Sequence, residues 1–317
     1  MAFSQSIVTP VGLDSVRRFR HYRAAVKAIA DYQVALHESA VFRRTNGMTV
    51  TDQDQPEEAF CFCPTRPSAP PLVIIGGMGP LAGAHAFRNA CARFRDSRAV
   101  VLYQACSVPD RSTVILGERR PDTLRCHAMA AKLTAAVRRA VNLAPPGSIT
   151  AHCIIACNSA HYFWQLVADD LERTPLRRCE VRMVSLVESV VQSLRGQFCN
   201  RALLLATEGA RVGQVFSAPC RDAGIAIDEP SPMLSLLLMS TIFEGMKSLD
   251  ERRAVELGNE FFEGILRSGR DYDCIVAACT ELPLTIDMLR LRGSPSVVAF
   301  LSRVKIVDPL QEAFCHV

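Results

Sequence analysis

The stretch 153-CIIACNSAH-161 places an apolar run directly in front of Cys157, and 274-CIVAACTEL-282 repeats this arrangement around Cys279. In both stretches a buried strand is expected to deliver a cysteine, and then polar residues, into a turn. A single cysteine of this kind is more often a packing residue, because free cysteine is common in protein cores. Two at matching positions form a weak internal repeat, which predicts two similar lobes that face each other.

Short apolar runs alternate with helical stretches around these cysteines. The predicted strands cover residues 72–76, 99–104, 149–156, 181–186, 202–207, 273–278 and 304–308. The stretches 122–142 and 249–269 are typical of amphipathic helices. Continuous apolar runs separated by helices indicate an α/β fold whose parallel strands are covered on both faces. Ligands in such folds bind beyond the carboxyl ends of the strands, which is where both cysteines lie.

The first seventy residues or so differ from the rest. Residues 14–44 predict one long helix, which the Asn46-Gly47 pair ends. The polar, proline-rich stretch 48–71 predicts a linker. We therefore expect an N-terminal helical extension ahead of two α/β lobes. The expected division is residues 1–71 for the extension and linker, 72–186 with about 300–317 for the first lobe, and 187–299 for the second.

The composition of the 317 residues is that of an ordinary globular protein, with 49% hydrophobic and 21% charged residues and a net charge of +4. The basic clusters are short and acids are interspersed, which argues against nucleic-acid binding. No apolar run is long enough to span a bilayer, and no continuous apolar segment near the start indicates a secretory signal. The arginine-rich start leaves an organelle-targeting leader as an alternative, which Asp14, Asp31 and Glu38 weaken.

Cysteine is frequent in this chain. Thirteen cysteines without a secretory signal indicate a reducing compartment, so we expect a cytoplasmic protein with free thiols. An odd number also fits poorly with a complete disulfide framework. Cys61 and Cys63 are spaced C-x-C, but no second pair follows at zinc-ribbon spacing, so no metal site is expected.

A glycine-rich turn follows the first predicted strand of the α/β part, in 72-LVIIGGMGPLAG-83. Gly76, Gly77 and Gly79 allow the backbone to approach a ligand closely, although a tight strand-to-helix turn explains the same residues. The stretch matches neither G-x-G-x-x-G nor a P-loop, so it gives little support to nucleotide binding.

Five motifs in this order, GGMGP, VPDR, CNSAH, LLATEG and CTELP, closely resemble those of the aspartate/glutamate racemase family. The resemblance extends over about residues 72–310. It implies two α/β lobes related by a pseudo-twofold axis, with the active site in the cleft between them. It also implies a small amino-acid substrate and catalysis with neither pyridoxal phosphate nor a metal. Homodimers are common among the proteins that the chain resembles.

The resemblance assigns Cys157 and Cys279 to an acid/base pair, and the chemistry explains why two cysteines are needed. Racemisation removes the Cα proton from one face and returns a proton to the other. One thiolate acts as base and the opposing thiol as acid, with the roles exchanged for the other enantiomer. A thiolate requires a pKa lowered by nearby donors or positive charge. Asn158, Ser159 and Thr280 are expected to bind the substrate carboxylate and to stabilise the developing carbanionic charge.

A second carboxylate on the substrate requires fixed cations. Arg111, in VPDRST, matches the arginine with which similar enzymes bind the side-chain carboxylate, and arginine suits a bidentate contact. Lys247, in IFEGMKS, matches a lysine with a related part in some family members. The alternative for either residue is an exposed surface cation. The expected substrate-binding residues are Gly77, Met78, Gly79, Arg111, Asn158, Ser159, Lys247 and Thr280.

Two further residues near the cysteines have two interpretations each. His161 either polarises the site or forms local hydrogen bonds at the start of a helix. Glu281 either orients a neighbouring group or caps the following turn. Because an acidic side chain raises the pKa of an adjacent thiol, Glu281 would need a partner of its own.

The chain departs from the family pattern at several positions near the motifs. Ser159 stands where threonine is usual and keeps the hydroxyl, Ala278 replaces a glycine, and Ala210 replaces a frequent threonine. The stretch 104-QACS-107 replaces a more common asparagine-bearing segment. Because the cysteine pair is intact, these departures concern the choice of substrate.

Three functions are compatible with these patterns. The leading hypothesis is a cofactor-independent racemase, an isomerase that interconverts the L- and D-forms of aspartate or glutamate. The second is a related reaction on the same fold, as in hydantoin racemases, maleate isomerases and arylmalonate decarboxylases; the presence of two cysteines argues against the single-cysteine decarboxylase. The third is a non-catalytic amino-acid-binding protein whose N-terminal helix contacts a partner.

Overall fold

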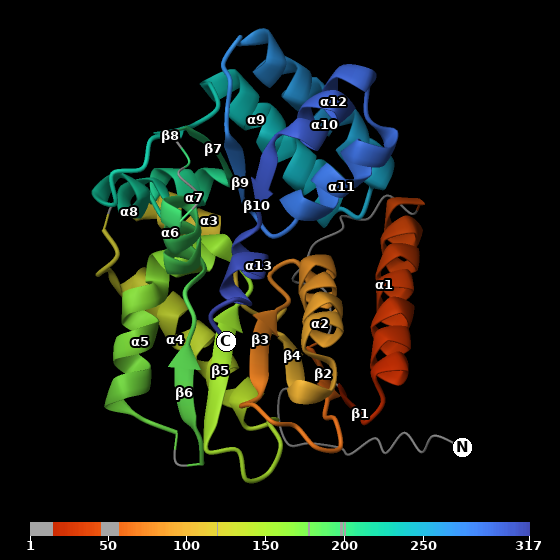
Figure 1. Cartoon of the computed structure of the whole chain (residues 1–317). Helices are drawn as coiled ribbons and strands as arrows, with labels where there is room; N and C mark the ends of the chain where they lie inside the picture. The colour runs from red at the N-terminus through yellow and green to blue at the C-terminus, as the bar shows by residue number, and fades with distance from the viewer. Residues whose placement is uncertain (1–14, 46–56, 119, 177, 197–198, 200) are drawn as a thin grey trace.

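Two sheets form the frame of the protein (Figure 1) in a computed structural model that describes residues 15–45, 57–118, 120–176, 178–196, 199 and 201–317. Within these residues the first sheet has the strand order β1-β2-β4-β3-β5-β6 and the second has the order β10-β9-β7-β8. The neighbouring strands run parallel, except that β2 runs antiparallel to β4. The strands are β1 (Ser15–Phe19), β2 (Glu58–Phe62), β3 (Leu72–Gly76), β4 (Val100–Gln104), β5 (Thr150–Ile155), β6 (Glu180–Met183), β7 (Ala202–Ala206), β8 (Ile227–Asp228), β9 (Cys274–Ala278) and β10 (Lys305–Val307).

Helices cover both sheets. Those before β6 are α1 (Tyr22–Thr45), α2 (Pro80–Phe94), η2 (Arg95–Ser97), α3 (Arg111–Gly117), α4 (Leu124–Val141), η3 (Asn158–Phe163) and α5 (Trp164–Arg173). Those after β6 are α6 (Leu186–Gly196), α7 (Glu208–Val212), α8 (Ser217–Asp222), α9 (Pro232–Ser240), the π-helical η4 (Thr241–Lys247), α10 (Glu251–Arg267), α11 (Leu282–Arg292), α12 (Pro295–Arg303) and α13 (Pro309–Ala313).

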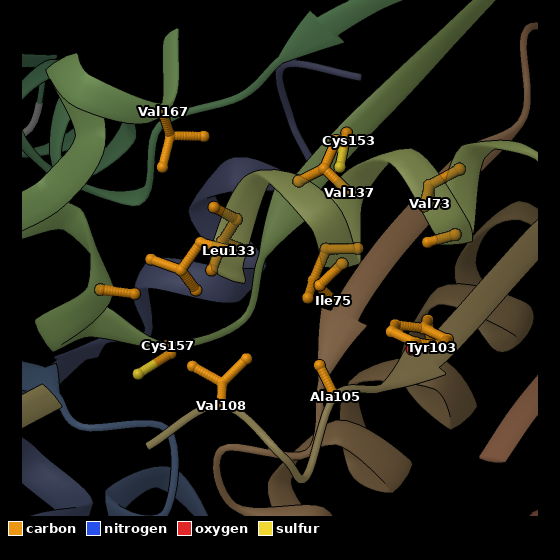
Figure 2. Close-up of a cluster of buried hydrophobic side chains, with 14 of the residues drawn as sticks. Val73, Ile75, Tyr103, Ala105, Val108, Leu133, Val137, Cys153, Cys157 and Val167 are labelled. Carbon is orange, nitrogen blue, oxygen red and sulfur yellow. The ribbon is translucent and has the colours of Figure 1, made fainter. Parts of the chain in front are cut away.

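Side chains of the first sheet alternate between two cores, as the two-residue period of a strand requires. Val73 and Ile75 lie in a core with α4 and α5, which Figure 2 shows, whereas Leu72 and Ile74 lie in a core with α1, α2 and α13. The second sheet alternates in the same way between α9–α12 on one face and α6–α8 on the other. The α/β fold and all of the strands expected from residue 72 onward are therefore confirmed.

The N-terminal part of the chain, defined here as residues 15–45 and 57–62, joins the first sheet. β1 occupies the start of the stretch that was expected to be one helix, so α1 begins only at Tyr22, and β2 lies inside the expected linker. Phe60 and Phe62 are fully buried in the core that contains α1 and α2. The expectation of a separate extension over 1–71 is therefore wrong for these residues. Residues 1–14 and 46–56, including the expected helix stop at Asn46-Gly47, lie outside the described residues.

The end of the chain divides between the two lobes. α12 packs in a core of the second sheet and β10 pairs with β9, which corrects the expectation that about 300–317 completes the first lobe. α13 and the residues that follow it return to the first lobe, because Leu310, Ala313 and Phe314 are buried in the core of the first sheet with α2, and Val317 packs against the same core. The pseudo-twofold relation between the lobes stays a prediction.

Candidate active site

A pocket opens between the two lobes, at the carboxyl ends of strands from both sheets. The turn after β3, the start of α3 and the turn after β5 form one wall, and the ends of β7 and β9 together with η4 form the other. The lining residues are Met78, Asp110, Arg111, Ser112, Cys157, Asn158, Ser159, Thr207, Phe243, Lys247, Ala278, Cys279, Thr280 and Glu281.

Cys157 lies between the core and the pocket. It follows β5 with an extended backbone and directly precedes η3. Cys153, four residues earlier on β5, is fully buried, whereas Figure 2 shows Cys157 beside Val108 at the lower left of the cluster. The Cys157 Sγ atom lies 3.4 Å from Ser159 Oγ.

His161 supports the turn that carries Cys157 and does not line the pocket. Its Nε2 accepts a hydrogen bond from the Leu186 N–H at 3.1 Å, so Nδ1 of the neutral ring carries the proton and donates to the Cys157 carbonyl oxygen, also at 3.1 Å. The ring stacks on Trp164 with the centroids 5.0 Å apart. Burial lowers the pKa of His161 to about 4, so the ring is neutral near pH 7. These contacts favour local hydrogen bonding over polarisation of the site.

Cys279 follows β9 and is bonded to a carboxylate. Its thiol donates to Glu281 Oε2 at 3.0 Å, and the Thr280 hydroxyl donates to the same oxygen at 3.0 Å. Burial raises the pKa of Cys279 well above its ordinary value; the negative charge of Glu281 adds to this rise and the positive charge of Lys247 opposes it. Cys279 therefore rests as a thiol. Glu281 orients this neighbour, and its side chain makes no capping hydrogen bond to α11.

The glycine-rich turn after β3 contacts the second lobe at Glu281. A Cβ atom at Gly79 would overlap Glu281 Oε1, so only glycine lets this carboxylate lie against the turn. Gly77 has a φ of +85°, and a Cβ atom there would collide with the backbone of Gln104 and Ala105. Neither glycine lines the pocket, whereas Met78 between them does. The two glycines thus shape the turn, and their binding of substrate stays a prediction.

Two cations from different lobes donate to one carbonyl oxygen. Arg111 Nη2 lies 2.9 Å from the Met78 oxygen, and Lys247 Nζ lies 3.4 Å from it. Arg111 Nη1 also donates to the carbonyl oxygens of Val108 and Pro109, at 3.3 and 2.9 Å. Arg111 is only 4% exposed, so the surface-cation alternative is wrong for it. The arrangement brings two positive charges from opposite walls together at Met78, where a carboxylate is a suitable partner.

Asn158 offers buried polar atoms to the pocket. Its side-chain nitrogen and oxygen have no hydrogen-bond partner among the described residues, and the residue is 3% exposed. An unpartnered buried polar group costs about 1–3 kcal/mol, so a ligand that bonds to this amide gains affinity. Ser159 and Thr280 also line the pocket, but their hydroxyls already contact the Cys157 sulfur and Glu281.

The pocket also contains residues that sequence reasoning missed. Asp110 and Thr207 are N-caps, which accept hydrogen bonds from the N–H groups of Thr113 at 2.7 Å and Ala210 at 3.4 Å. Both stand inside motifs already recognised, VPDR and LLATEG, so their place at the start of a helix was the available signal. Phe243 lies on η4, and its ring is 4.8 Å from Lys247 Nζ. No local pattern distinguishes this phenylalanine from a core residue.

The remaining cysteines are free thiols outside the pocket. Cys61 lies in the core of the first sheet, where burial raises its pKa to about 12. Within the described ranges, no three His, Cys, Asp or Glu side chains are grouped so that they could hold a metal ion. No helix in the same ranges has the length and apolar character needed to cross a membrane.

Comparison with known proteins gives the same fold. The aspartate racemase of Picrophilus torridus matches at 19% identity over 76% of this chain and 90% of that chain, with a TM-score of 0.54. An aspartate racemase homologue from Pyrococcus horikoshii matches at 18% identity over 78% of this chain and 97% of that chain, with a TM-score of 0.52. A glutamate racemase from Bacillus anthracis matches at 12% identity over 78% of this chain and 80% of that chain, with a TM-score of 0.50. The Asp/Glu/Hydantoin racemase family model matches residues 75–314, so the chain belongs to this family.

Proposed function

We propose that the protein racemises an acidic amino acid, aspartate or glutamate, by proton transfer between the substrate Cα, Cys157 and Cys279, without a cofactor. The observation that carries the proposal is that these two cysteines, which follow strands of different sheets, line one pocket. Thiols on separate lobes can approach a bound Cα from two sides. This is what inversion of configuration requires, because the proton leaves one face and another proton arrives at the opposite face.

The contacts of the two thiols suit a first step in which Cys279 is the acid. Its proton is held by the bond to Glu281, whereas Cys157 has the Ser159 hydroxyl beside its sulfur. For one enantiomer the Cys157 thiolate takes the Cα proton while the Cys279 thiol delivers its own. The enzyme then holds a Cys157 thiol and a Cys279 thiolate, which is the state that reacts with the other enantiomer.

The polar lining supports an acidic substrate. Arg111 and Lys247 place two positive charges where a side-chain carboxylate would pair with them. The amide of Asn158 is a donor for the α-carboxylate. Negative charge that develops on Cα spreads into this carboxylate, so a donor that binds it stabilises the transition state more than the substrate.

The test is incubation of the full chain in deuterium oxide with each enantiomer of aspartate and of glutamate. We expect deuterium at Cα, seen by NMR, together with the opposite enantiomer, seen by chiral chromatography, for at least one amino acid. Calorimetry on the same samples measures binding. If all four amino acids show neither exchange nor inversion, the proposal fails, and binding without turnover would indicate the non-catalytic alternative.

Glu281→Gln is expected to move the acidic limb of the pH profile of kcat/KM to lower pH, for the direction of racemisation in which Cys279 is the base. The carboxylate raises the pKa of Cys279, so a neutral amide lowers that pKa toward its ordinary value. The thiolate forms as the pH rises through the pKa, and a lower pKa therefore places the acidic limb of kcat/KM at lower pH. The profiles of both directions are measured. Asp287→Asn, an exposed carboxylate on α11, is the matched control, and an unmoved limb in Glu281→Gln would contradict the assigned interaction.

A further inference from the structure

The stretch 104–107, where the chain departs from the family pattern, contacts the N-terminal part of the chain. The Ser107 hydroxyl donates a hydrogen bond to Glu57 Oε1. Gln104 Nε2 donates to the Tyr32 hydroxyl at 3.4 Å and to the Pro80 carbonyl oxygen at 2.8 Å. Neither Gln104 nor Ser107 lines the pocket. The departures therefore accompany contacts with α1 and with the residue before β2, outside the pocket lining.

Glu57 holds both sides of the turn that follows β4. The pairing of β2 with β4 sets Ala59 opposite Tyr103, which brings the preceding Glu57 to the end of β4. Glu57 Oε2 accepts a hydrogen bond from the Tyr103 hydroxyl at 2.5 Å, and Arg139 Nη1 lies 3.5 Å from the same oxygen. Its other oxygen accepts from Ser107, beyond the end of the strand. A buried carboxylate must keep such donors to offset its loss of hydration, so these contacts restrict the turn.

The same turn carries Arg111 into the pocket. Arg111 is the first residue of α3, and its guanidinium donates to the carbonyl oxygens of Val108 and Pro109. These two residues directly follow Ser107, so a turn held at Ser107 also holds the carbonyl oxygens that orient the guanidinium. A cation that is already oriented loses less conformational freedom when it binds a carboxylate.

We propose that Glu57 is a positioning residue for Arg111. A carboxylate from the N-terminal part of the chain holds the turn at 105–110 and thereby pre-organises the cation that binds the side-chain carboxylate of the substrate. Glu57 acts through Ser107 and does not itself touch the substrate. The inference rests on the proposed function, because that function assigns a substrate carboxylate to Arg111.

The experiment compares Glu57→Gln and Ser107→Ala with the control Glu58→Gln in the full chain. Ser107→Ala removes only the bond to the turn and leaves the contact between Glu57 and Tyr103. Glu58 is the adjacent carboxylate, but it accepts from Ser15 at 2.9 Å and from Arg17 at 3.2 Å, away from this turn. We expect KM for the acidic amino acid to rise about tenfold in both test variants, with kcat nearly unchanged, and both constants to stay unchanged in Glu58→Gln. In the double variant, the rise in the free energy that corresponds to KM should be smaller than the sum of the two single effects, because both changes remove the same contact between Glu57 and Ser107.

Hydrogen exchange of a peptide containing residues 105–111, measured by mass spectrometry, tests the positioning without catalysis. We expect faster exchange in Glu57→Gln and Ser107→Ala and none of this change in Glu58→Gln. Unchanged exchange overturns the inference, and so does faster exchange without a rise in KM. If the wild-type chain does not racemise any acidic amino acid, the proposed function fails. The affinity for succinate as a dicarboxylate probe then replaces KM, and an unaltered affinity in both test variants overturns the positioning role.

Discussion

Cys157→Ser and Cys279→Ser are each expected to lower kcat for inversion in both directions by about 10²–10⁴-fold. Serine keeps the size of the side chain, but its hydroxyl does not ionise where a thiol does. One direction therefore loses its base, and the other loses its acid. The remaining cysteine still reaches one face of the substrate. We expect it to remove and return the proton on that face, so each variant exchanges deuterium into one enantiomer without inverting it.

The two variants should label opposite enantiomers, because the cysteines belong to different lobes. Proton NMR in deuterium oxide measures the exchange, chiral chromatography measures inversion, and thermal unfolding establishes that the variants are folded. Cys315→Ser, which removes an exposed thiol, is the control that should behave as wild type. Labelling of the same enantiomer by both variants would place both thiols on one face of the substrate, and normal inversion by either would exclude the two-base scheme.

Arg111→Lys is expected to lower kcat/KM for the acidic amino acid by about 10–100-fold, mainly through KM. The guanidinium reaches three carbonyl oxygens with two nitrogens, those of Met78, Val108 and Pro109. A lysine keeps the charge but has one nitrogen, so it cannot retain the two turn contacts and also face the pocket. The two coplanar N–H donors with which a guanidinium binds a carboxylate are lost as well.

Steady-state kinetics with both enantiomers measure this effect, and thermal unfolding separates it from a loss of folding. Arg125→Lys is the matched control, because Arg125 is 60% exposed and pairs at 3.4 Å with Glu118 away from the pocket. If Arg111→Lys retained the wild-type KM for aspartate and for glutamate, Arg111 would not bind the side-chain carboxylate. Lys247 would then be the remaining cation of the pocket.

The strands that build the site are encoded locally. The runs that became β3, β5, β7 and β9 are continuous and apolar, and each is covered on both faces, so their side chains alone indicate buried parallel strands. The carboxyl end of such a strand is also a local feature. The placement of Cys157 and Cys279 at strand ends, each followed by polar residues, was therefore predictable from the sequence.

The edge of the first sheet could not be predicted in the same way. β1 contains two arginines among its five residues, and β2 lies inside a polar, proline-rich stretch. What makes them strands is their pairing with each other and with β4, which lies some forty residues beyond β2. The backbone hydrogen bonds that stabilise such a strand come from distant residues. A polar or helix-like local sequence therefore does not indicate that the strand forms.

The sequence by itself determined the α/β fold, the family and which cysteines end the central strands, because strand burial and motif spacing are properties of neighbouring residues. Only the tertiary structure decided that both cysteines and two cations share one pocket. It also decided that His161 supports the turn that carries Cys157 and does not line the pocket. It also decided that Gly79 makes room for Glu281 and that Glu57 holds the turn before Arg111. These roles depend on contacts between elements far apart in the chain, whose directions are set by packing and not by the residues beside them.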